Sequence, residues 1–329
     1  MDVLFLIRGR EHPASRYRVL QYLEPLAAEG VRADVRDFPH SHAEWKALDP
    51  ALDRRPVLFV QKKRLGPVRL WRLRKRGVRV LYDFDDAVMF QSSRHDSPDS
   101  LGRSLRFRWM ARGSDGIIAG SQYLADLARP HNHRVWVIPT SIDVRKYPLH
   151  EPSSNGRITL GWIGGAKSLV FLAALKPAFE RLARELPQLR LKIVCNEFFD
   201  CPPMEVVKKP WSEAEEGEDV RSFDIGLAPL PDDPWSRGKC ATKLLQCMAA
   251  AVPCVASPVG SHEEIVSDGE NGLFARAHDE WASQISRLVR DPALAARIGA
   301  AGRRTVEERY SLASSAPRLL EALRAVGAP

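Results

Sequence analysis

The sequence predicts an α/β protein made of two doubly wound parallel-sheet domains that face a cleft. Three observations support this class. Short apolar runs, typical of strands buried on both faces, alternate with amphipathic segments. The alternation stops in a stretch rich in proline and polar residues, 138–157, and restarts with the run ITLGWIGG. Two strand–helix series separated by a linker fit two domains better than one large sheet.

The first series occupies the N-terminal half. Its expected strands are rich in Val, Ile and Leu: Val3–Ile7, Val57–Gln61, Val78–Tyr82, Gly116–Ala119 and Val135–Ile138. Between them, two amphipathic segments predict the helices Ser15–Glu29, which ends at Gly30, and Ser121–Ala128. We take residues 1–147 as the N-terminal domain.

The second series has the same rhythm. Its expected strands are Ile158–Ile163, Leu189–Cys195, Asp224–Pro229 and Pro253–Ala256. Helices are expected near Ser168–Glu185 and near Lys239–Ala251. We take residues 148–305 as the C-terminal domain and residues 306–329 as a helical tail that packs back on the N-terminal domain.

Composition indicates a globular cytoplasmic protein. The start MDVLFLIR carries charges at positions 2 and 8, which indicates a first strand and not a signal peptide. The longest apolar run, Leu244–Gly260, contains Gln246 and two prolines and does not predict a spanning helix. Five cysteines without a CxxC pair are typical of buried thiols in a reducing compartment, with a zinc site or a disulfide as alternatives.

The formal net charge of +8 is concentrated in the N-terminal half, in Gln61–Arg79 and Arg103–Arg112. A basic surface favours anionic partners: phosphorylated substrates, anionic lipid headgroups or nucleic acid. Nucleic acid is the least favoured, because no recognised binding module accompanies the charge. We hypothesise salt-sensitive, peripheral association with the inner face of a membrane. The alternative is a solvated helix whose residues Leu70, Leu73 and Trp71 pack inward.

The segment Phe223–Phe274 carries the clearest chemical signal. An apolar strand ends in a polar loop, and a helix is expected to begin near Gly238. On that helix Lys239, Lys243 and Gln246 recur at i, i+4 and i+7 and share one face. Free amides at a helix N-terminus, with these lysines and Arg237 beside them, form a cradle for a pyrophosphate. The alternative is an exposed basic helix end.

The run GKCATKLLQCMAAAVPCVASPVGSHEEIV, which includes Glu264, resembles the donor-binding segment of family 4 retaining glycosyltransferases. The runs GENGLF and AGRRTVEERYS resemble that family's downstream pattern, and HPASRYRVLQYLEPLAAEG and VLYDFDDAV resemble its N-terminal pieces. The resemblance covers essentially the whole chain. It implies a GT-B architecture of two Rossmann-like domains, a nucleotide sugar in the C-terminal domain and an acceptor in the N-terminal domain. It also implies glycoconjugate or polysaccharide synthesis without a metal or other cofactor.

One departure from the family has consequences. Family members usually carry two glutamates eight positions apart in this segment, one contacting the donor sugar and the other the ribose. The matching residues here are Gly238 and Gln246. An amide oxygen accepts a hydroxyl hydrogen bond, but glycine offers no side chain.

Two further donor elements are expected. Gly164 and Gly165 follow a strand and permit close backbone approach, and Lys167 lies within reach of a phosphate. An ordinary turn is the alternative. Trp211 falls near the position of the family's nucleotide base, where it would stack on the base; a core or hinge tryptophan is the other interpretation.

Three carboxylates, Asp83, Asp85 and Asp86, follow the strand VRVLY. They are candidates for binding acceptor hydroxyls or for general-base catalysis. Helix capping by Asp85 or Asp86 is one alternative. The pattern Asp83-Phe84-Asp85 also satisfies the DxD motif of metal-dependent GT-A transferases, which the donor segment contradicts.

The first loop, Arg8–Arg18, contains Ser15 as the expected helix N-cap. Arg10, Arg16 and Arg18 are candidates for binding donor phosphates or an anionic acceptor, and the alternative for Arg18 is a solvent-facing side chain.

Together these features predict transfer of a sugar from a nucleoside diphosphate to a hydroxyl of a glycan, a lipid-linked compound or a small molecule, with retention of configuration. The alternatives are a GT-B nucleotide-sugar epimerase and a catalytically impaired nucleotide-sugar-binding protein.

Overall fold

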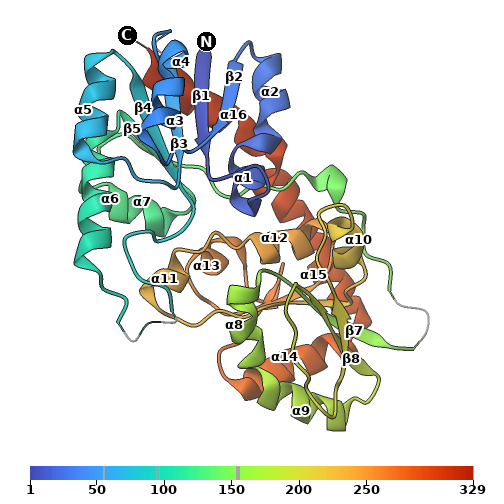
Figure 1. Ribbon diagram of the computed structural model, residues 1–329. Coiled ribbons are helices and arrows are strands. Elements are labelled where there is room, and N and C mark those ends of the chain that lie inside the picture. The colour runs from blue at the N-terminus through green and yellow to red at the C-terminus, as the bar shows by residue number, and fades with distance from the viewer. Residues whose placement is uncertain (55, 94, 96, 153–155, 329) are drawn as a thin grey trace. The chain divides into compact units, whose positions relative to one another are not determined.

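The computed structural model describes residues 1–54, 56–93, 95, 97–152 and 156–328. The described chain forms two compact units, each built on a parallel six-stranded sheet covered by helices (Figure 1). Unit 1 comprises Met1–Ser141, Asp233–Cys240 and Leu312–Pro329, and unit 2 comprises Ile142–Asp232 and Ala241–Ser311. The predicted fold class, α/β with two doubly wound parallel sheets, is confirmed.

The sheet of unit 1 has the strand order β2-β1-β3-β4-β5-β6. Its strands are β1 (Asp2–Ile7), β2 (Arg32–Asp37), β3 (Val57–Gln61), β4 (Arg79–Phe84), β5 (Gly116–Ala119) and β6 (Val135–Val137). β1 pairs in parallel with both β2 and β3, so that Phe5 lies opposite Val35 on one side and Phe59 on the other. The strand order reverses at β1, which makes the ends of β1 and β3 the topological switch point of this sheet.

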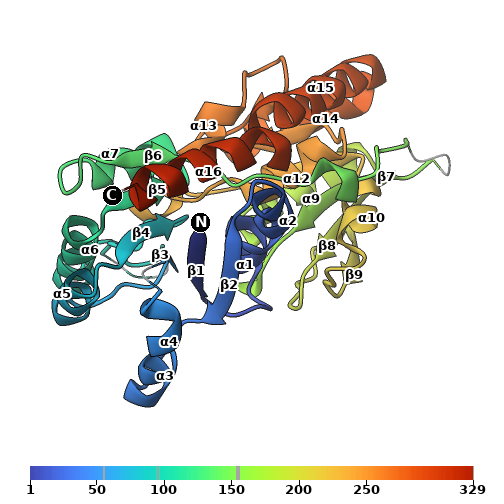
Figure 2. The same ribbon diagram turned by 90° about the horizontal axis from the view of Figure 1, so that it is seen from above.

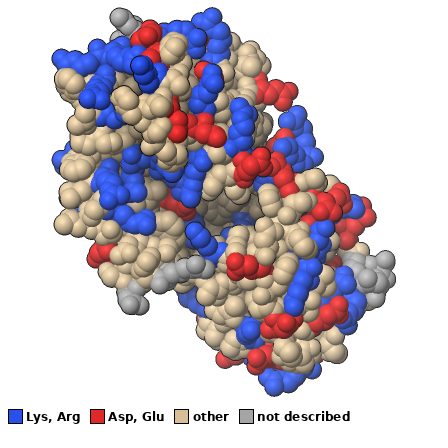
Figure 3. Space-filling view, viewed as in Figure 1, with Lys and Arg blue, Asp and Glu red and all other residues tan. Residues whose placement is uncertain are grey.

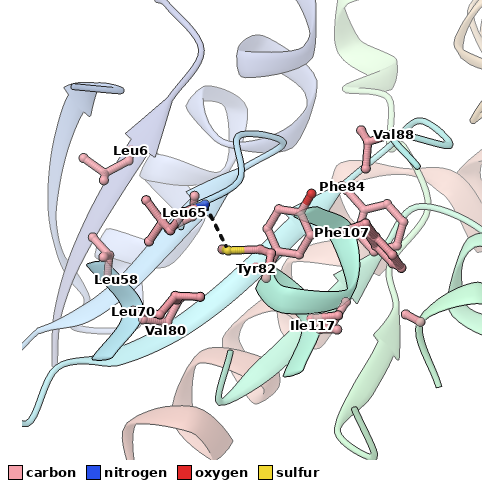
Figure 4. Packing of buried hydrophobic residues seen from close by; sticks show 14 of the residues in the cluster. Leu6, Leu58, Leu65, Leu70, Val80, Tyr82, Phe84, Val88, Phe107 and Ile117 are labelled. Atoms are coloured by element: carbon pink, nitrogen blue, oxygen red, sulfur yellow. Dashed lines mark hydrogen bonds between the residues drawn. The ribbon is translucent and has the colours of Figure 1, made fainter. Parts of the chain in front are cut away.

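Helices cover both faces of this sheet because successive strand residues point to opposite faces. One face packs against η1 (Leu20–Tyr22), α2 (Leu23–Ala28) and α16 (Leu312–Gly327), while α1 (Pro13–Arg18) is hydrogen-bonded to the ends of β3 and β4. The other packs against α3 (His42–Ala47), α4 (Asp49–Leu52), α5 (Pro67–Lys75), α6 (Leu101–Gly113) and α7 (Gln122–Ala128). In the second layer Tyr82 and Phe84 of β4 lie next to Phe107 of α6, and the Leu65 amide donates to Met110 Sδ at 3.4 Å (Figure 4).

The sheet of unit 2 has the strand order β12-β11-β10-β7-β8-β9. Its strands are β7 (Ile158–Ile163), β8 (Leu189–Val194), β9 (Glu205–Lys209), β10 (Ile225–Ala228), β11 (Cys254–Ala256) and β12 (Leu273–Phe274). Its α-helices are α8 (Leu169–Ala173), α9 (Lys176–Glu185), α10 (Glu216–Arg221), α12 (Thr242–Ala249), α13 (Ser261–Ile265), α14 (His278–Arg290) and α15 (Pro292–Thr305). Shorter helical turns are η2 (Val144–Lys146), η3 (Ala166–Ser168) and η4 (Val306–Tyr310), and α11 (Pro234–Arg237) belongs to unit 1.

Several expected boundaries are corrected. The division between the units falls at Ser141–Ile142 and not after residue 147, because Ile142 already pairs with Ser311 of unit 2. The helix expected over 15–29 is divided into α1, η1 and α2: the non-helical backbone of Val19 ends α1, and Pro25, which lacks an N–H, lies in the first turn of α2. The helix expected over 168–185 is likewise divided into α8 and α9, with Pro177 in the first turn of α9.

Strands β2 and β9 were not expected from the sequence. Both lie at a sheet edge, and their side chains are mostly exposed or half-buried. An edge strand lacks the continuous apolar run of a central parallel strand, so the pattern that predicted β1 and β7 is missing there.

No helix in the described part of the chain is both long and apolar enough to cross a membrane. All five cysteines are buried free thiols.

Candidate functional site

Polar side chains gather at the carboxyl ends of the parallel strands in each unit, which is where open α/β sheets bind ligands. In unit 1 they follow β1, β3 and β4. In unit 2 they follow β7 and β11 and occupy the first turns of α12.

A buried ion pair underlies the unit 1 cluster. Asp83, at the end of β4, is 0% exposed, and Arg18 of α1 is 3% exposed. Arg18 Nε lies 3.1 Å from Asp83 Oδ1, and Arg18 Nη1 donates to the Ile138 carbonyl at 2.7 Å. Burial alone lowers the pKa of Arg18, but the charge and hydrogen bonds of Asp83 raise it overall. Asp83 and Arg18 therefore hold each other inside unit 1, which corrects their assignment as substrate-contacting and phosphate-binding groups.

The loop after β1 is fixed by Gln61 of β3. The fully buried Gln61 Oε1 accepts from the Arg8 amide at 3.0 Å and from Ser15 Oγ at 2.9 Å. The expectation that Ser15 caps the helix is therefore wrong. Ser15 is buried, and its hydrogen bond to Gln61 joins α1 to β3. The cap of α1 is His12, whose Nδ1 accepts from the Ala14 amide at 3.1 Å.

Arg16 lies on the same helix. Its Nη2 donates to Tyr17 Oη at 2.7 Å, and its guanidinium lies 4.5 Å from the centroid of the Tyr17 ring. Arg16 is half-buried, whereas Ser15 and Arg18 are buried, so Arg16 keeps a charge that is accessible at the surface.

Lys62 joins the other two carboxylates. It follows β3 with a left-handed backbone (φ +58°), and its Nζ lies 3.0 Å from Asp85 Oδ1 and also contacts Asp86 Oδ2. Burial alone raises the pKa of Asp85, but Lys62 and then Arg18 more than offset it and lower the pKa overall. Asp85 is therefore ionised and paired at neutral pH. These side chains are only 13–21% exposed, which places them at the edge of the surface.

His12 completes this cluster and was not singled out as a functional residue from the sequence. It is half-buried, and burial, then the charges of Arg8 and Lys62, lower its pKa to about 4. It is therefore a neutral imidazole at neutral pH. The sequence signal was a histidine followed by a proline in the loop after a buried strand, three positions after Gly9.

The segment Asp233–Cys240 packs on the Asp85–Ala87 turn within unit 1. Cys240 Sγ lies 3.2 Å from the Asp85 carbonyl oxygen. A Cβ on Gly238 would lie 2.5 Å from Ala87 Cβ and 2.8 Å from its amide nitrogen. Only a glycine fits in this contact. Packing against Ala87 therefore explains why residue 238 is not the glutamate that the family usually has.

Lys239 was expected on the helix that carries Lys243, with Arg237 beside a helix start near Gly238, and this is corrected. Arg237 ends α11, whose N-cap Asp233 accepts from the Trp235 and Ser236 amides. α12 begins only at Thr242, because Ala241 has a left-handed backbone (φ +52°). Lys239 Nζ instead lies 5.4 Å from the Trp235 ring centroid, in unit 1.

Lys243 and the glycine loop after β7 meet in unit 2. A Cβ on Gly164 would lie 2.2 Å from Lys243 Cε, so the lysine stem crosses the space that the glycine leaves open. The Lys243 ammonium lies 5.6 Å from the Trp162 ring centroid. Gly165 has open space around its Cα, and Lys167 is exposed on η3. The structure thus brings the first turn of α12 beside the carboxyl end of β7.

Gln246 belongs to a buried polar network. Its Nε2 donates to Tyr147 Oη at 3.1 Å, and that hydroxyl donates to Glu216 Oε1 at 2.6 Å. Trp211 Nε1 donates to Glu216 Oε2 at 3.0 Å. Trp211 and Gln246, both predicted donor residues, are therefore linked through two residues that the sequence did not indicate.

His262 of α13 was also not indicated by the sequence. It is 3% exposed, and its Nδ1 lies 2.9 Å from the Ser257 carbonyl oxygen, which fixes this nitrogen as the donor. Burial lowers the pKa of His262 to about 4. The hydrogen bond to the Ser257 carbonyl raises this pKa, and the charge of Lys243 lowers it further. Glu264, on the same helix, is exposed, and its carbonyl accepts from Tyr310 Oη at 3.3 Å.

Solved structures with this architecture identify the fold. The Anabaena protein Alr3699/HepE, crystallised with UDP, superposes with a TM-score of 0.69 and 15% identity over 99% of this chain and 100% of its own. A sucrose-phosphate synthase from Thermosynechococcus elongatus gives a TM-score of 0.76 and 16% identity over 99% and 98%. The fold is GT-B, as the family resemblance implied.

Sequence comparison agrees with the fold. Residues 176–321 match the family described as glycosyl transferase-like. A D-inositol 3-phosphate glycosyltransferase from Kineococcus radiotolerans is 24% identical over 70% of this chain and 61% of its own length. An alpha-maltose-1-phosphate synthase from Mycolicibacterium smegmatis is 39% identical over 26% of this chain and 24% of its own. The chain thus spans less than two thirds of the length of these relatives.

The chain therefore has the GT-B fold, and its C-terminal part matches a glycosyl transferase-like family, in agreement with the predicted resemblance to GT-B glycosyltransferases. Glycosyl transfer by this chain and membership of family 4 stay predictions.

Proposed function

We propose that the protein transfers a sugar from a nucleoside diphosphate sugar to an acceptor hydroxyl with retention of configuration. Unit 2 binds the donor, and unit 1 binds the acceptor. The observation that carries the proposal is Lys243 laid across Gly164, at the carboxyl edge of the unit 2 sheet and in the first turn of α12. A cation beside the free amides of a helix N-terminus favours binding of an anionic group such as a diphosphate.

The chemistry follows from the charge that develops. As the bond between the sugar C1 and the leaving phosphate oxygen breaks, negative charge grows on the diphosphate, where the Lys243 ammonium stabilises it. The acceptor oxygen forms a new bond to C1 on the same face, and its proton passes to the departing diphosphate. No divalent cation enters this scheme.

The network of Gln246, Tyr147, Glu216 and Trp211 is assigned to the nucleoside end of the donor. Glu216 is 4% exposed and bonded to both Tyr147 and Trp211, which orients the amide of Gln246 and the indole of Trp211. Structures of HepE with UDP and with UDP-glucose support UDP-glucose as the first donor to test.

The test incubates the full chain with UDP-, GDP-, ADP- and TDP-sugars, each with a glycan, a lipid-linked saccharide and a small hydroxyl compound. Release of the nucleotide that depends on the acceptor supports sugar transfer. An anomeric proton of the product with the same configuration as in the donor, measured by NMR, supports retention. Inverted product contradicts retention. Sugar interconversion without release identifies an epimerase.

Gly238 and Gln246, in place of the family's glutamates, favour a second candidate function: a protein that binds the nucleotide sugar without transferring it. Calorimetric donor binding without release for any acceptor would support this candidate.

A further inference from the structure

The exposed apolar side chains of unit 1 concentrate on two neighbouring helices. α5 and α6 lie beside each other along one edge of the unit (Figures 1 and 2), and Gly113 of α6 packs on Leu70 of α5. Trp71 is 59% exposed on α5, and Trp109 is 47% exposed on α6. Val68 and Leu101, on the same helices, are 62% and 76% exposed. Exposed apolar groups gathered in this way mark an interaction surface.

The exposure of Trp71 corrects one expectation. Leu70 and Leu73 pack inward, as a solvated amphipathic helix requires, but Trp71 does not join them. Val68, Trp71, Arg72 and Lys75 instead occupy one outer face of α5, at i, i+3, i+4 and i+7.

The same helices are strongly basic and contain no acidic residue. Their exposed cations are Arg72, Arg74, Lys75, Arg106, Arg108 and Arg112. Basic side chains accordingly cover much of the part of unit 1 where α5 and α6 lie (Figure 3).

Neighbouring cations are neutralised within the fold, but these six are not. Arg76 bonds to Asp49 and Asp53, and Arg79 lies 3.2 Å from Asp115. Within the described residues, none of the six exposed cations forms an ion pair with a carboxylate. The positive charge of this surface is therefore available to an external partner.

We propose that the outer face of α5 and α6 binds an anionic lipid bilayer. Lipid headgroups supply the negative charge, and tryptophan and aliphatic side chains enter the boundary between headgroups and acyl chains. Each cation near such a surface strengthens binding by about fivefold, so six suffice for reversible attachment. Arginine stems also bury their methylene groups there while the guanidinium stays at the phosphates. Val68 and Leu101 favour a bilayer over nucleic acid, because aliphatic side chains gain little against a phosphate backbone.

Lipid binding by this face does not require sugar transfer, so a binding experiment alone tests it. The full chain is floated with vesicles of phosphatidylcholine and with vesicles containing phosphatidylglycerol, at low and high salt. We expect binding only to the anionic vesicles at low salt. In the variant R72S/R74S/R108S/R112S, the partition coefficient onto anionic vesicles should fall several-hundredfold, because each of the four cations contributes about fivefold. The matched control, R184S/R287S/R290S/R304S, removes four exposed cations of unit 2 and should bind nearly normally.

A second measurement follows the aromatic side chains. Brominated lipids should quench tryptophan fluorescence of the wild type, and the variant W71F/W109F should lose most of this quenching. Circular dichroism and melting of each variant monitor the fold. Absence of vesicle binding at low salt overturns the proposal, as does equal loss in the unit 2 control. Binding to heparin or RNA without binding to vesicles also overturns it, in favour of a polyanion site.

Discussion

At the scale of single residues, the space left by one glycine sets the position of one charge. The Lys243 stem passes where a Cβ of residue 164 would lie, 2.2 Å from Lys243 Cε. The glycine and the lysine therefore act as one unit, although 79 positions separate them in the printed numbering.

Replacing Lys243 with alanine should weaken binding of the nucleotide sugar by about 1.5–3 kcal/mol, the range for a charge-assisted hydrogen bond. Calorimetric titration with UDP-glucose measures this change. The control is Lys208→Ala, which removes an exposed lysine of the same unit that pairs with Asp200. Equal affinity of the Lys243 variant and the wild type would remove the diphosphate assignment.

Replacing Gly238 with alanine should destabilise the protein by about 1–3 kcal/mol, the cost of overpacking. The added Cβ would lie 2.5 Å from Ala87 Cβ. Urea unfolding compares this variant with Gly66→Ala, where a Cβ meets no atom within 4 Å. By the same reasoning, Gly238→Glu should not restore a family-like site. A stable Gly238→Glu protein with increased transfer would show that the Ala87 contact is dispensable.

The stability of the protein should depend on His262 in the acid range. Burial lowers its pKa from 6.5 to about 4, so the unfolded chain binds the proton more readily than the folded one. Its contribution is complete above the unfolded pKa and is lost as the pH falls toward the folded pKa. We expect the free energy of unfolding to fall by roughly 2 kcal/mol from about pH 7 to about pH 5 through this residue. Since burial lowers the pKa of His12 as well, only the difference between wild type and His262→Gln isolates the effect. An identical pH dependence in both proteins would exclude it.

At the scale of elements, the predictable parts are those with a repeating apolar pattern. β1, β3 and β7 are buried along nearly their whole length, and the sequence placed them within a residue of their observed bounds. The start of α12 was misplaced because a left-handed alanine at 241 has no sequence signature. Glycine or asparagine would have signalled it.

The last helix, α16, is an integral layer of unit 1. Leu323 is 0% exposed and belongs to the cluster formed with Phe5 and Phe59. Replacing it with alanine should cost about 2–5 kcal/mol in unfolding free energy, because a cavity remains. Guanidinium unfolding checks this, with Arg324→Ala as the control, whose side chain is 59% exposed. A loss below that of the control would mean that α16 is peripheral to the core.

At the scale of the whole molecule, we expect sugar transfer to survive chelation. Lys243 and the amides of α12 supply the positive charge that a divalent cation supplies elsewhere. Transfer assays with and without EDTA measure this. Loss of activity on chelation, restored by manganese, would instead assign Asp85 and Asp86 as metal ligands and would require Lys62 to leave them.

The sequence located the candidate site better than its internal contacts. Gly164 was named because it lies in a strand-end loop, Lys243 because it lies at a helix start, and Gln246 because of its helical spacing and the family resemblance. Their partners Tyr147, Glu216 and His262 were not, because those contacts join residues far apart in the chain. The role of Asp83 was missed for the same reason: 65 positions separate it from Arg18, and periodicity carries no information about a buried pair.

The interleaving of the two units along the chain also constrains how the protein is made. β1 and β3 leave the ribosome well before α16, the helix that covers one face of their sheet. At ordinary rates of synthesis, the intervening residues of unit 2 take roughly ten seconds or more to produce. During that time the side chains of Phe5, Phe59 and Leu81 that face α16 have no partner from that helix. The nascent N-terminal half is therefore expected to depend on chaperones until α16 has been made, whereas unit 2 can fold before that.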